Sequence, residues 1–472
     1  MRHPHQNMLL LLSILITTLQ GIGQQTSSTV HHVSAQQAVQ LALKQRTEVL
    51  NARIDLENQV SINREITGQA YPQVRGSIGV NKNFNIPVTV LPDFISPSVY
   101  GVLEAEDVRD GNGNPIKFDG VINTFPAQFG VPWQAQLGIS VQQIFFQPDV
   151  IVGLQARKSA LLLYENQLKV SEDSVKSNVF NTYYGALVAE KGLEYTQKSF
   201  ERLTQLYKEQ EELFKNGFIE KLDLEKTKVN LTNVRTTVSR LQNIVKLSYA
   251  ALKFALALPQ TDSLHLTDAL TDDMVKDGLL ELEADFKYEQ RNEIKTLQSS
   301  EDLLKLQVKR YKWQAFPTLA ATWNVATSAQ RQKFDFFDRD GRWFYSNVLG
   351  INMNIPIIDA NQRREKVRQA ELALKKNQNT INQFKQVIDL QTINARTSLK
   401  NALDILSNQQ ENRDLAEKVF NTTKIKYQQG LGSSFEVLQA ETDLQTSYSN
   451  YYQALYDASI ARIGYMRAVG KL

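Results

Sequence analysis

The sequence has no cysteine, few histidines and no excess of charge of either sign. Without cysteine there are no disulfides, thiolate metal sites or cysteine nucleophiles. The five histidines show no zinc-binding spacing, and no nucleophile–base pair or phosphate-binding loop is present. We therefore expect no enzyme activity, no metal and no cofactor. The 53 basic residues nearly balance the 50 acidic ones, so the composition also gives no indication of a nucleic-acid partner.

Long apolar runs are missing as well, except near the N-terminus. The stretch from Met8 to Leu19 follows the basic Arg2 and is shorter than the about 20 residues that span a bilayer as a helix. A short apolar core followed by small residues is typical of a secretory signal. We predict a signal peptide over residues 1–24 and an exported mature protein.

Proline is scarce and unevenly distributed. Most of the 12 prolines lie between Pro72 and Pro148, and the intervals without proline are where long helices can form, because an interior proline breaks a helix. At about 1.5 Å per residue, the longest would extend roughly 100 Å. The predicted helices are 34–70, 149–215, 219–258, 281–315, 360–428 and 434–469.

Two of these intervals are split by a glycine in a similar setting. Gly217 lies in FKNGFIEKLDLEKTK (214–228) and Gly430 in YQQGLGSSFEVLQAE (427–441), 213 positions apart (430 minus 217). Glycine adopts the left-handed conformation that ends many helices without a steric penalty. We predict that each glycine ends a long helix and begins the return of a helical hairpin.

The glycines belong to a wider internal duplication. The segment RTEVLNARIDLENQVSINREITGQAYPQV (46–74) aligns without gaps with RNEIKTLQSSEDLLKLQVKRYKWQAFPTL (291–319), and LGISVQQIFF (137–146) with LGINMNIPII (349–358). We predict two structural repeats, 25–258 and 283–472, joined by a polar linker, 259–282, that contains a short strand or helix.

Each repeat contains two segments that alternate strongly between apolar and polar residues. They are predicted as strands at about 73–85, 133–146, 318–327 and 343–356. This pattern suits a membrane strand with lipid on one side and water on the other, but a strand of a soluble sandwich alternates in the same way. All four tryptophans lie in or beside these segments, as in an interfacial aromatic belt: Trp133, Trp313, Trp323 and Trp343.

Four strands are too few for a membrane barrel, because the smallest have eight. Open strand edges do not occur in lipid. If the strands lie in a membrane, several chains must therefore share one barrel.

The order of these elements and the two glycine tips resemble the TolC family of outer-membrane efflux channels over essentially the whole mature chain. The resemblance implies a mainly α fold with a membrane β part. It implies a homotrimer in which four strands per chain form a 12-stranded β-barrel, while the hairpins form an α-barrel extending into the periplasm. It also implies location in the outer membrane of a Gram-negative bacterium and contact with outer-membrane lipid. The implied partners are a periplasmic adaptor protein and an inner-membrane transporter.

The resemblance further assigns roles to residues at the tips. Adaptor docking would involve Gly217, Phe218, Leu222, Gly430, Leu431 and Phe435. Tyr427 and Asp223 match the family's tyrosine and its acid partner at the periplasmic entrance, whereas Gly432 stands where the family has an arginine. The two pore acids of the family correspond to Glu436 and Gln439, of which only the first is acidic.

A threefold ring of Glu436 carboxylates would favour cations. The alternative is a solvated acid that is stabilised by the helix N-terminus.

We thus predict a passive trimeric outer-membrane channel of a tripartite efflux or type I secretion system. The alternative is an exported soluble coiled-coil scaffold or adhesin with a small β-domain. One feature is asymmetric: the first inter-strand segment is 33 residues longer than the second (65 from Pro72 to Leu137 against 32 from Pro317 to Leu349). We expect this extra length, including the polar stretch DVRDGNGNPI (107–116), to form an external loop that partly covers the outer mouth.

Overall fold

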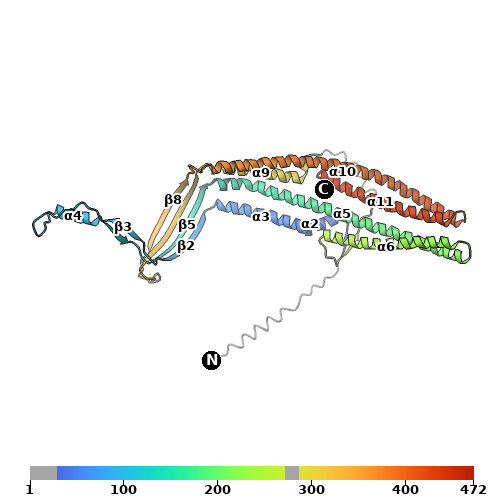
Figure 1. The fold of residues 1–472 in the computed structure, drawn as a ribbon, viewed down its shortest axis with the longest axis horizontal. Helices are drawn as coiled ribbons and strands as arrows, with labels where there is room; N and C mark the ends of the chain where they lie inside the picture. The colour runs from blue at the N-terminus through green and yellow to red at the C-terminus, as the bar shows by residue number, and fades with distance from the viewer. Residues whose placement is uncertain (1–28, 272–285) are drawn as a thin grey trace, which may run out of the picture. The chain divides into compact units, whose positions relative to one another are not determined.

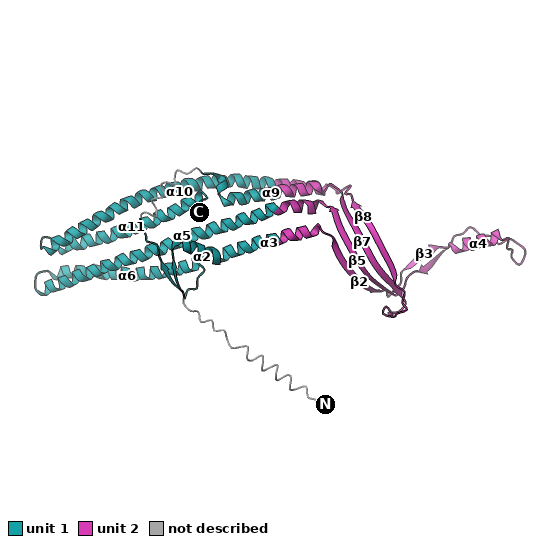
Figure 2. Ribbon diagram, turned by 180° about the vertical axis from the view of Figure 1, so that it is seen from behind, with its two compact units in different colours: residues 1–60, 158–303, 374–472 teal, residues 61–157, 304–373 magenta. Residues whose placement is uncertain are grey.

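The structure is a computed structural model that describes residues 29–271 and 286–472. The predicted signal peptide and residues 272–282 of the predicted linker lie outside this part of the chain. The chain divides into two units, residues 1–60, 158–303 and 374–472 in the first and residues 61–157 and 304–373 in the second (Figure 2).

The first unit is built on two helical hairpins. α5 (Pro148–Lys215) is followed by α6 (Lys221–Ala255), and α10 (Gln362–Gln428) by α11 (Ser434–Ala468) (Figure 1). α5 and α10 have 68 and 67 residues and α6 and α11 have 35 each, so each hairpin pairs a long helix with a short one. Among the described residues, no helix has a stretch both long and apolar enough to cross a membrane.

The shorter helices differ from the sequence prediction. The predicted helix 34–70 is wrong as one element, because α2 (Ala35–Gln45) and α3 (Thr47–Gln69) are separated at Arg46, whose ψ of 129° is extended. The Arg46 guanidinium donates to the Phe254 carbonyl at 2.9 Å and pairs with Glu48. This anchors the break to the end of α6.

The helix predicted at 281–315 begins later than expected. Residues 281–285 lie outside the described chain, Tyr288–Gln290 form a single 3₁₀ turn, η1, and α9 spans Asn292–Trp313. Arg291 separates the two elements with an extended ψ of 122°. The separation resembles the break at Arg46, because the guanidinium of Arg291 donates to the Ala468 carbonyl at 2.9 Å.

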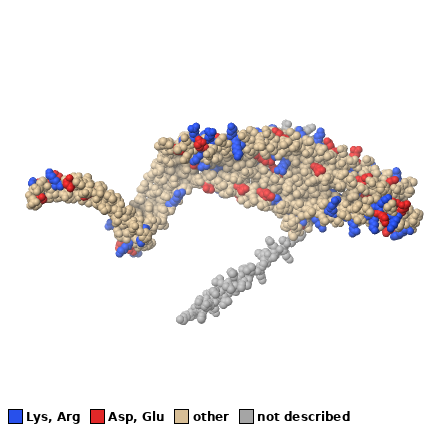
Figure 3. Space-filling view, in the orientation of Figure 1, with Lys and Arg blue, Asp and Glu red and all other residues tan. Residues whose placement is uncertain are grey.

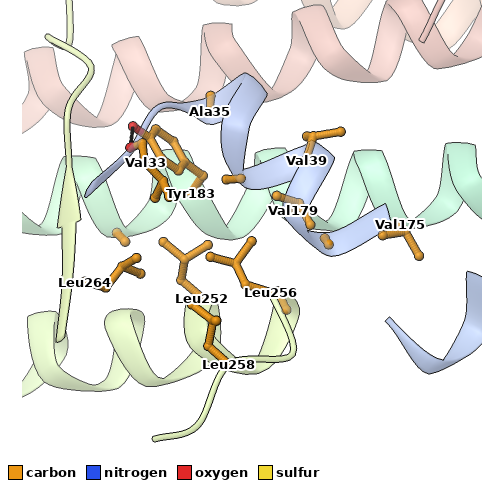
Figure 4. Packing of buried hydrophobic residues seen from close by; sticks show 14 of the residues in the cluster. Val33, Ala35, Val39, Val175, Val179, Tyr183, Leu252, Leu256, Leu258 and Leu264 are labelled. Carbon is orange, nitrogen blue, oxygen red and sulfur yellow. Dashed lines mark hydrogen bonds between the residues drawn. The ribbon is translucent and has the colours of Figure 1, made fainter. Parts of the chain in front are cut away.

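A short parallel pair that the sequence did not predict lies beside the hairpin of α5 and α6. β1 (Val30–Val33) pairs with β6 (Ser263–Leu266), which places a short strand in the predicted linker. Its side chains join a core between α2, α5 and α6 in which the Tyr183 hydroxyl donates to the Val33 carbonyl at 3.1 Å (Figure 4). The core includes Val33, Ala35, Val39, Val175, Val179, Leu252, Leu256, Leu258 and Leu264.

The second unit contains one antiparallel sheet of four strands in the order β2-β5-β7-β8. The strands are β2 (Gln73–Lys82), β5 (Trp133–Phe146), β7 (Thr318–Arg331) and β8 (Phe344–Asn354). β2 and β8 end before the predicted 85 and 356, whereas β7 continues past the predicted 327. β8 stops before Pro356, whose ring could not donate to a ladder.

The register places most of the apolar residues of the four strands on one face, although Val348 and Phe344 lie on the other. Ile78 lies opposite Leu137, and Trp323 lies between Val141 and Leu349. Directly opposed residues point to the same side of a sheet. The alternation seen in the sequence therefore produces one continuous apolar face, which we call the apolar sheet face: Val74, Ile78, Val80, Leu137, Ile139, Val141, Leu319, Ala321, Trp323, Val325, Leu349, Ile351 and Met353.

The long segment between β2 and β5 has secondary structure of its own. β3 (Val88–Pro92) pairs with β4 (Thr124–Gln128), and α4 (Ile95–Ala105) lies between them in the sequence. The polar stretch 107–116 is a turn in which Asp110 accepts hydrogen bonds from the backbone N–H groups of Asn112 and Asn114.

Candidate functional site at the hairpin tips

Both hairpins turn through the same hydrogen-bonded motif. At the end of α5, the Phe218 N–H donates to the Leu213 carbonyl at 2.9 Å and the Gly217 N–H to the Phe214 carbonyl at 2.9 Å. At the end of α10, the Leu431 N–H donates to Lys426 and the Gly430 N–H to Tyr427. This is the Schellman motif, which requires a left-handed residue after the helix.

The two glycines supply that conformation. Gly217 has φ of 78° and Gly430 has φ of 75°, so the sequence prediction of left-handed glycines at both tips is confirmed. A Cβ at either position would meet no heavy atom within 4 Å. Glycine is therefore favoured here by backbone conformation and not by crowding within the chain.

Apolar side chains surround the glycines and point into solvent. Phe218 and Leu431 are 76 % and 77 % exposed, and Leu222 and Phe435 are 55 % and 59 % exposed. The ammonium of Lys226 lies 6.0 Å from the centre of the Phe435 ring, so the two tips are neighbours. Solvent-exposed apolar groups of this size, rimmed by charged side chains, are typical of a protein contact surface.

The candidate entrance residues lie on the same helix ends, but they do not form one network within the chain. Asp223 lies 3.6 Å from Lys226, and Gln439 donates to Asp443 at 2.9 Å. Glu436 is exposed in the first turn of α11, where its N–H donates to Ser433 Oγ at 3.2 Å. This carboxylate thus lies at the positive end of a helix dipole.

Tyr427 is partly buried against the apolar cluster between α5, α10 and α11. Its hydroxyl forms no hydrogen bond with the described residues, although the buried Gln210 amide lies beside it. Burial raises the pKa of Tyr427, and the neighbouring carboxylates of Glu209 and Asp223 raise it further. The tyrosine and its predicted acid partner, Asp223, thus interact electrostatically without a direct hydrogen bond.

Sequence reasoning missed an ion pair that lies between α5 and α11. Arg202 donates two hydrogen bonds to Glu441, at 2.9 Å from Nε and 2.7 Å from Nη2, and one to the Tyr195 hydroxyl at 3.1 Å. The Glu441 side chain is 3 % exposed. Burial acts against the charge of Arg202, but its hydrogen bonds to Glu441 raise its pKa. The partners are 239 positions apart. Glu441 ends the tip stretch 427–441, but nothing in that stretch points to Arg202.

The pair occupies one end of a small cleft between α5, α10 and α11. The cleft has a volume of about 40 Å³ and is also lined by Leu206, Tyr427 and Val437. Packing around it is aromatic: Tyr195 and Tyr448 stack with ring centres 3.8 Å apart, and the Arg202 guanidinium lies 5.5 Å from the Phe420 ring. Tyr427 links the cleft to the hairpin tip. Its side chain lines the cleft, and its backbone carbonyl accepts the Gly430 N–H of the Schellman motif.

Of the four tryptophans of the predicted belt, three lie beyond or at the ends of strands and Trp323 lies inside β7. Trp133 starts β5 and Trp343 precedes β8, and both pack near Phe334 and Phe336 in the turn after β7. Trp313 ends α9, and Trp323 lies in β7, where it donates to Asn347 at 2.7 Å. The surface in Figure 3 shows few charged side chains over the strands, in contrast to the helices and the loops.

Comparison with known proteins agrees with this arrangement. Residues 289–471 match the family model described as outer membrane efflux protein. No curated protein matches the sequence. The match agrees with the resemblance inferred from the sequence over this part of the chain.

Several solved structures share the fold. CusC matches with a TM-score of 0.69 and 16 % identity, covering 93 % of this chain and 92 % of that one. The CmeC outer membrane channel of Campylobacter jejuni matches with a TM-score of 0.68 and 16 % identity over 93 % of this chain and 85 % of that one. The outer membrane protein VceC of Vibrio cholerae gives 0.67 and 14 % over 92 % and 96 %. At these identities the likeness concerns the fold, which is that of outer-membrane channels.

Proposed function

We propose that this chain, part of which matches the outer membrane efflux protein family, is one subunit of a homotrimeric outer-membrane channel. Three copies would close a 12-stranded barrel in the membrane, and their hairpins would form a helical barrel in the periplasm. The channel would be passive. It would conduct substrates delivered by a periplasmic adaptor and an inner-membrane transporter to the exterior.

The apolar sheet face is the observation that carries this proposal. Ile78, Leu349 and Ile351 on this face are 82 %, 76 % and 73 % exposed, and β2 and β8 each have one edge that no described strand pairs. Apolar side chains in this number favour a lipid environment, and backbone groups at an open edge have no hydrogen-bonding partner there. Pairing β2 of one copy with β8 of the next would satisfy the edges and leave the apolar face toward lipid.

The other face of the sheet supports an aqueous lumen. The residues that alternate with the apolar face are mostly polar or small, and include Ser77, Gln136, Ser140 and Asn324. Alternation of apolar and polar residues between lipid and lumen is typical of membrane β-barrels. A soluble scaffold would instead need to cover the apolar face within the chain, which the described residues do not do.

The hairpin tips fit the role of an adaptor-docking surface and a periplasmic entrance. Their apolar side chains are largely exposed in the described chain, and the open space around Gly217 and Gly430 would admit another backbone closely. Asp223 and Glu436 occupy equivalent positions of the two hairpins, 213 positions apart (436 minus 223). Three copies would thus bring six carboxylates to the entrance.

The trimer is tested with the full-length protein produced in a Gram-negative host. Membrane extraction should require detergent, and unheated samples should migrate as a trimer that heating converts to monomer. The purified protein should form water-filled pores in planar bilayers. A monomer that stays folded in plain buffer would contradict the proposal and favour the soluble scaffold or adhesin.

Adaptor docking is tested separately. Phe218→Asp should abolish co-purification with a periplasmic adaptor from the same organism while the heat-modifiable trimer remains. Lys208→Asp, an exposed position of α5 away from the tip, is the matched control and should still bind. Equal binding by both variants would remove the tip from the docking surface.

A further inference from the structure

The long segment between β2 and β5 carries an apolar helix that the described chain leaves uncovered. α4 has no buried residue, and its Ile95, Val99 and Val102 side chains are 54 %, 50 % and 62 % exposed. Positions four and then three residues apart lie along one side of a helix. We call Ile95, Val99 and Val102 the α4 stripe.

The opposite side of α4 already has partners in its own segment. The Tyr100 ring packs against Phe118 with centres 5.9 Å apart, and Glu104 lies 3.5 Å from Lys117. These contacts lie at the surface, because Tyr100 is 37 % exposed. The α4 stripe lies on the side of the helix that faces away from them.

α4 is too short to be stable without further burial. It has 11 residues, and isolated helices shorter than about 12–15 residues are marginal in water. Gly101 in its interior weakens the helix further, because glycine has a low helix propensity. Asp93 supports the N-terminus by accepting the N–H groups of Ile95 and Ser96 at 3.1 and 2.9 Å. One capping carboxylate does not replace the burial of an apolar face.

The chemistry around the stripe favours a protein partner over lipid. α4 ends in a charged turn in which Arg109 lies 3.2 Å from Asp107, and Asp110 accepts two backbone N–H groups. Such a turn keeps this end of the helix in water. A small apolar patch rimmed by charges marks a contact between proteins.

The position of the segment in the chain identifies that partner as another copy. The segment leaves β2 after Lys82 and returns at Trp133, which is the end of the sheet opposite to the helices. β2 is also an edge strand. In a trimer closed through its sheet edges, each segment therefore begins at a seam between two chains, on the outer side of the membrane.

We propose that the three α4 stripes pack against one another and narrow the outer exit of the channel. This inference rests on the proposed trimer. The contact would bury the stripe, stabilise α4 and restrict the passage of external molecules into the lumen.

Cysteine cross-linking tests the contact directly, because the chain has no cysteine of its own. In the intact trimer, oxidation of Val99→Cys should give a disulfide-linked dimer on a denaturing gel without reductant. Glu104→Cys, on the opposite side of α4, is the matched control and should give none. A trimer in which Val99→Cys fails to cross-link, whether it reacts freely with a water-soluble maleimide or is shielded by another occupant, would overturn the inference.

Conductance tests the consequence. The double variant Val99→Asp/Val102→Asp should keep the heat-modifiable trimer and show a larger single-channel conductance than the wild type, because repelling carboxylates separate the helices. Unchanged conductance in an intact trimer would overturn the narrowing and leave the channel itself in place. Absence of any trimer or pore in the wild type would instead overturn the proposed function, and this inference with it.

Discussion

Glu436 and Glu441 lie five residues apart on α11, yet they have opposite environments. Glu436 is exposed at the start of the helix, whereas the Glu441 side chain is 3 % exposed and held by Arg202. At 3.6 residues per turn, positions five apart point to different sides of a helix. One carboxylate thus faces solvent at the start of α11, while the other joins two helices.

Replacement of the exposed acid tests its proposed place in a threefold ring. Glu436→Gln should lower the cation selectivity of the pore and weaken its block by multivalent cations. The reason is that the substitution removes three negative charges from a narrow aqueous neck. Planar-bilayer reversal potentials and blocking titrations measure both effects. Glu225→Gln, an exposed acid on α6, should change neither. Wild-type selectivity and block in Glu436→Gln would leave this carboxylate only its role at the helix N-terminus.

Replacement of the buried acid should affect stability. Glu441→Gln leaves the Arg202 charge without its ionic partner, and loss of one member of a buried pair costs about 3 kcal/mol or more. The double variant Arg202→Met/Glu441→Leu should be close to the wild type, because no charge remains buried. Thermal unfolding followed by circular dichroism compares the variants. If the single and the double variant lose equal stability, the contribution of these side chains would come from packing rather than from their charges.

At the scale of elements, α6 and α11 are alike in length and in how they end. After α6 the Leu258 N–H donates to the Lys253 carbonyl at 2.9 Å, and after α11 the Lys471 N–H donates to Met466 at 2.8 Å. The left-handed residue that follows the helix is Gly470 after α11 (φ 74°) but Ala257 after α6 (φ 56°). An alanine in this conformation costs roughly 1–2 kcal/mol.

Ala257→Gly should therefore stabilise the end of α6. The relief of strain exceeds the added backbone entropy of glycine, which leaves a gain of about 0.5–1 kcal/mol. Hydrogen exchange of the Leu258 amide should slow a few-fold. Gly470→Ala is the reverse test: it should destabilise the end of α11 strongly, because its Cβ would lie 2.8 Å from the Gln290 carbonyl oxygen. Faster exchange at Leu258 in Ala257→Gly would contradict this interpretation.

Several helices of the first unit bury tyrosines, which gives this unit a specific response to alkaline pH. Burial raises the pKa of Tyr183, Tyr195 and Tyr249 above the ordinary value of about 10. Above that pH the unfolded chain releases protons that the folded chain retains, so stability falls as pH rises. The unfolding temperature should therefore decline above about pH 10. Tyr249→Phe should make the decline shallower, whereas Tyr71→Phe, at a residue that is 63 % exposed, should not. If the unfolding temperature of Tyr249→Phe depends on pH in the same way as that of the wild type, Tyr249 does not contribute to the alkaline loss of stability.

The elements also show what sequence reasoning can and cannot supply. The left-handed glycines were predictable because only glycine adopts that conformation freely, and the shared apolar face because alternation fixes which side each residue takes. The break between α2 and α3 at Arg46 was not predictable from the sequence, since it depends on a hydrogen bond to the distant Phe254 carbonyl. The pairing of β1 with β6, and of Arg202 with Glu441, joins residues more than 230 positions apart. No local pattern marks such partners.

At the scale of the whole molecule, the helical unit and the sheet differ in how well a single chain buries their apolar side chains. The helical unit has buried cores of its own, such as the cluster around Tyr183. The four-stranded sheet instead exposes apolar side chains on one face, and no described strand pairs with the outer edge of β2 or of β8. This imbalance is what assembly and lipid would resolve, and it explains why the sheet rather than the helices decides between a membrane channel and a soluble scaffold.

Adjacent residues of β2 provide a sharp test of that choice. Ile78 belongs to the apolar sheet face and is 82 % exposed, while Ser77 points to the other face opposite Gly138. A lysine on the lipid side of a membrane strand costs up to about 2–4 kcal/mol near the midplane, whereas lumen positions tolerate charge. Ile78→Lys should therefore reduce the amount of heat-modifiable trimer in outer membranes, and the effect is repeated in each of the three copies. Ser77→Lys should assemble normally and change only ion selectivity. In a soluble scaffold a lysine at Ile78 would be harmless, because that side chain already faces water. Equal assembly of the two variants would therefore contradict the membrane barrel.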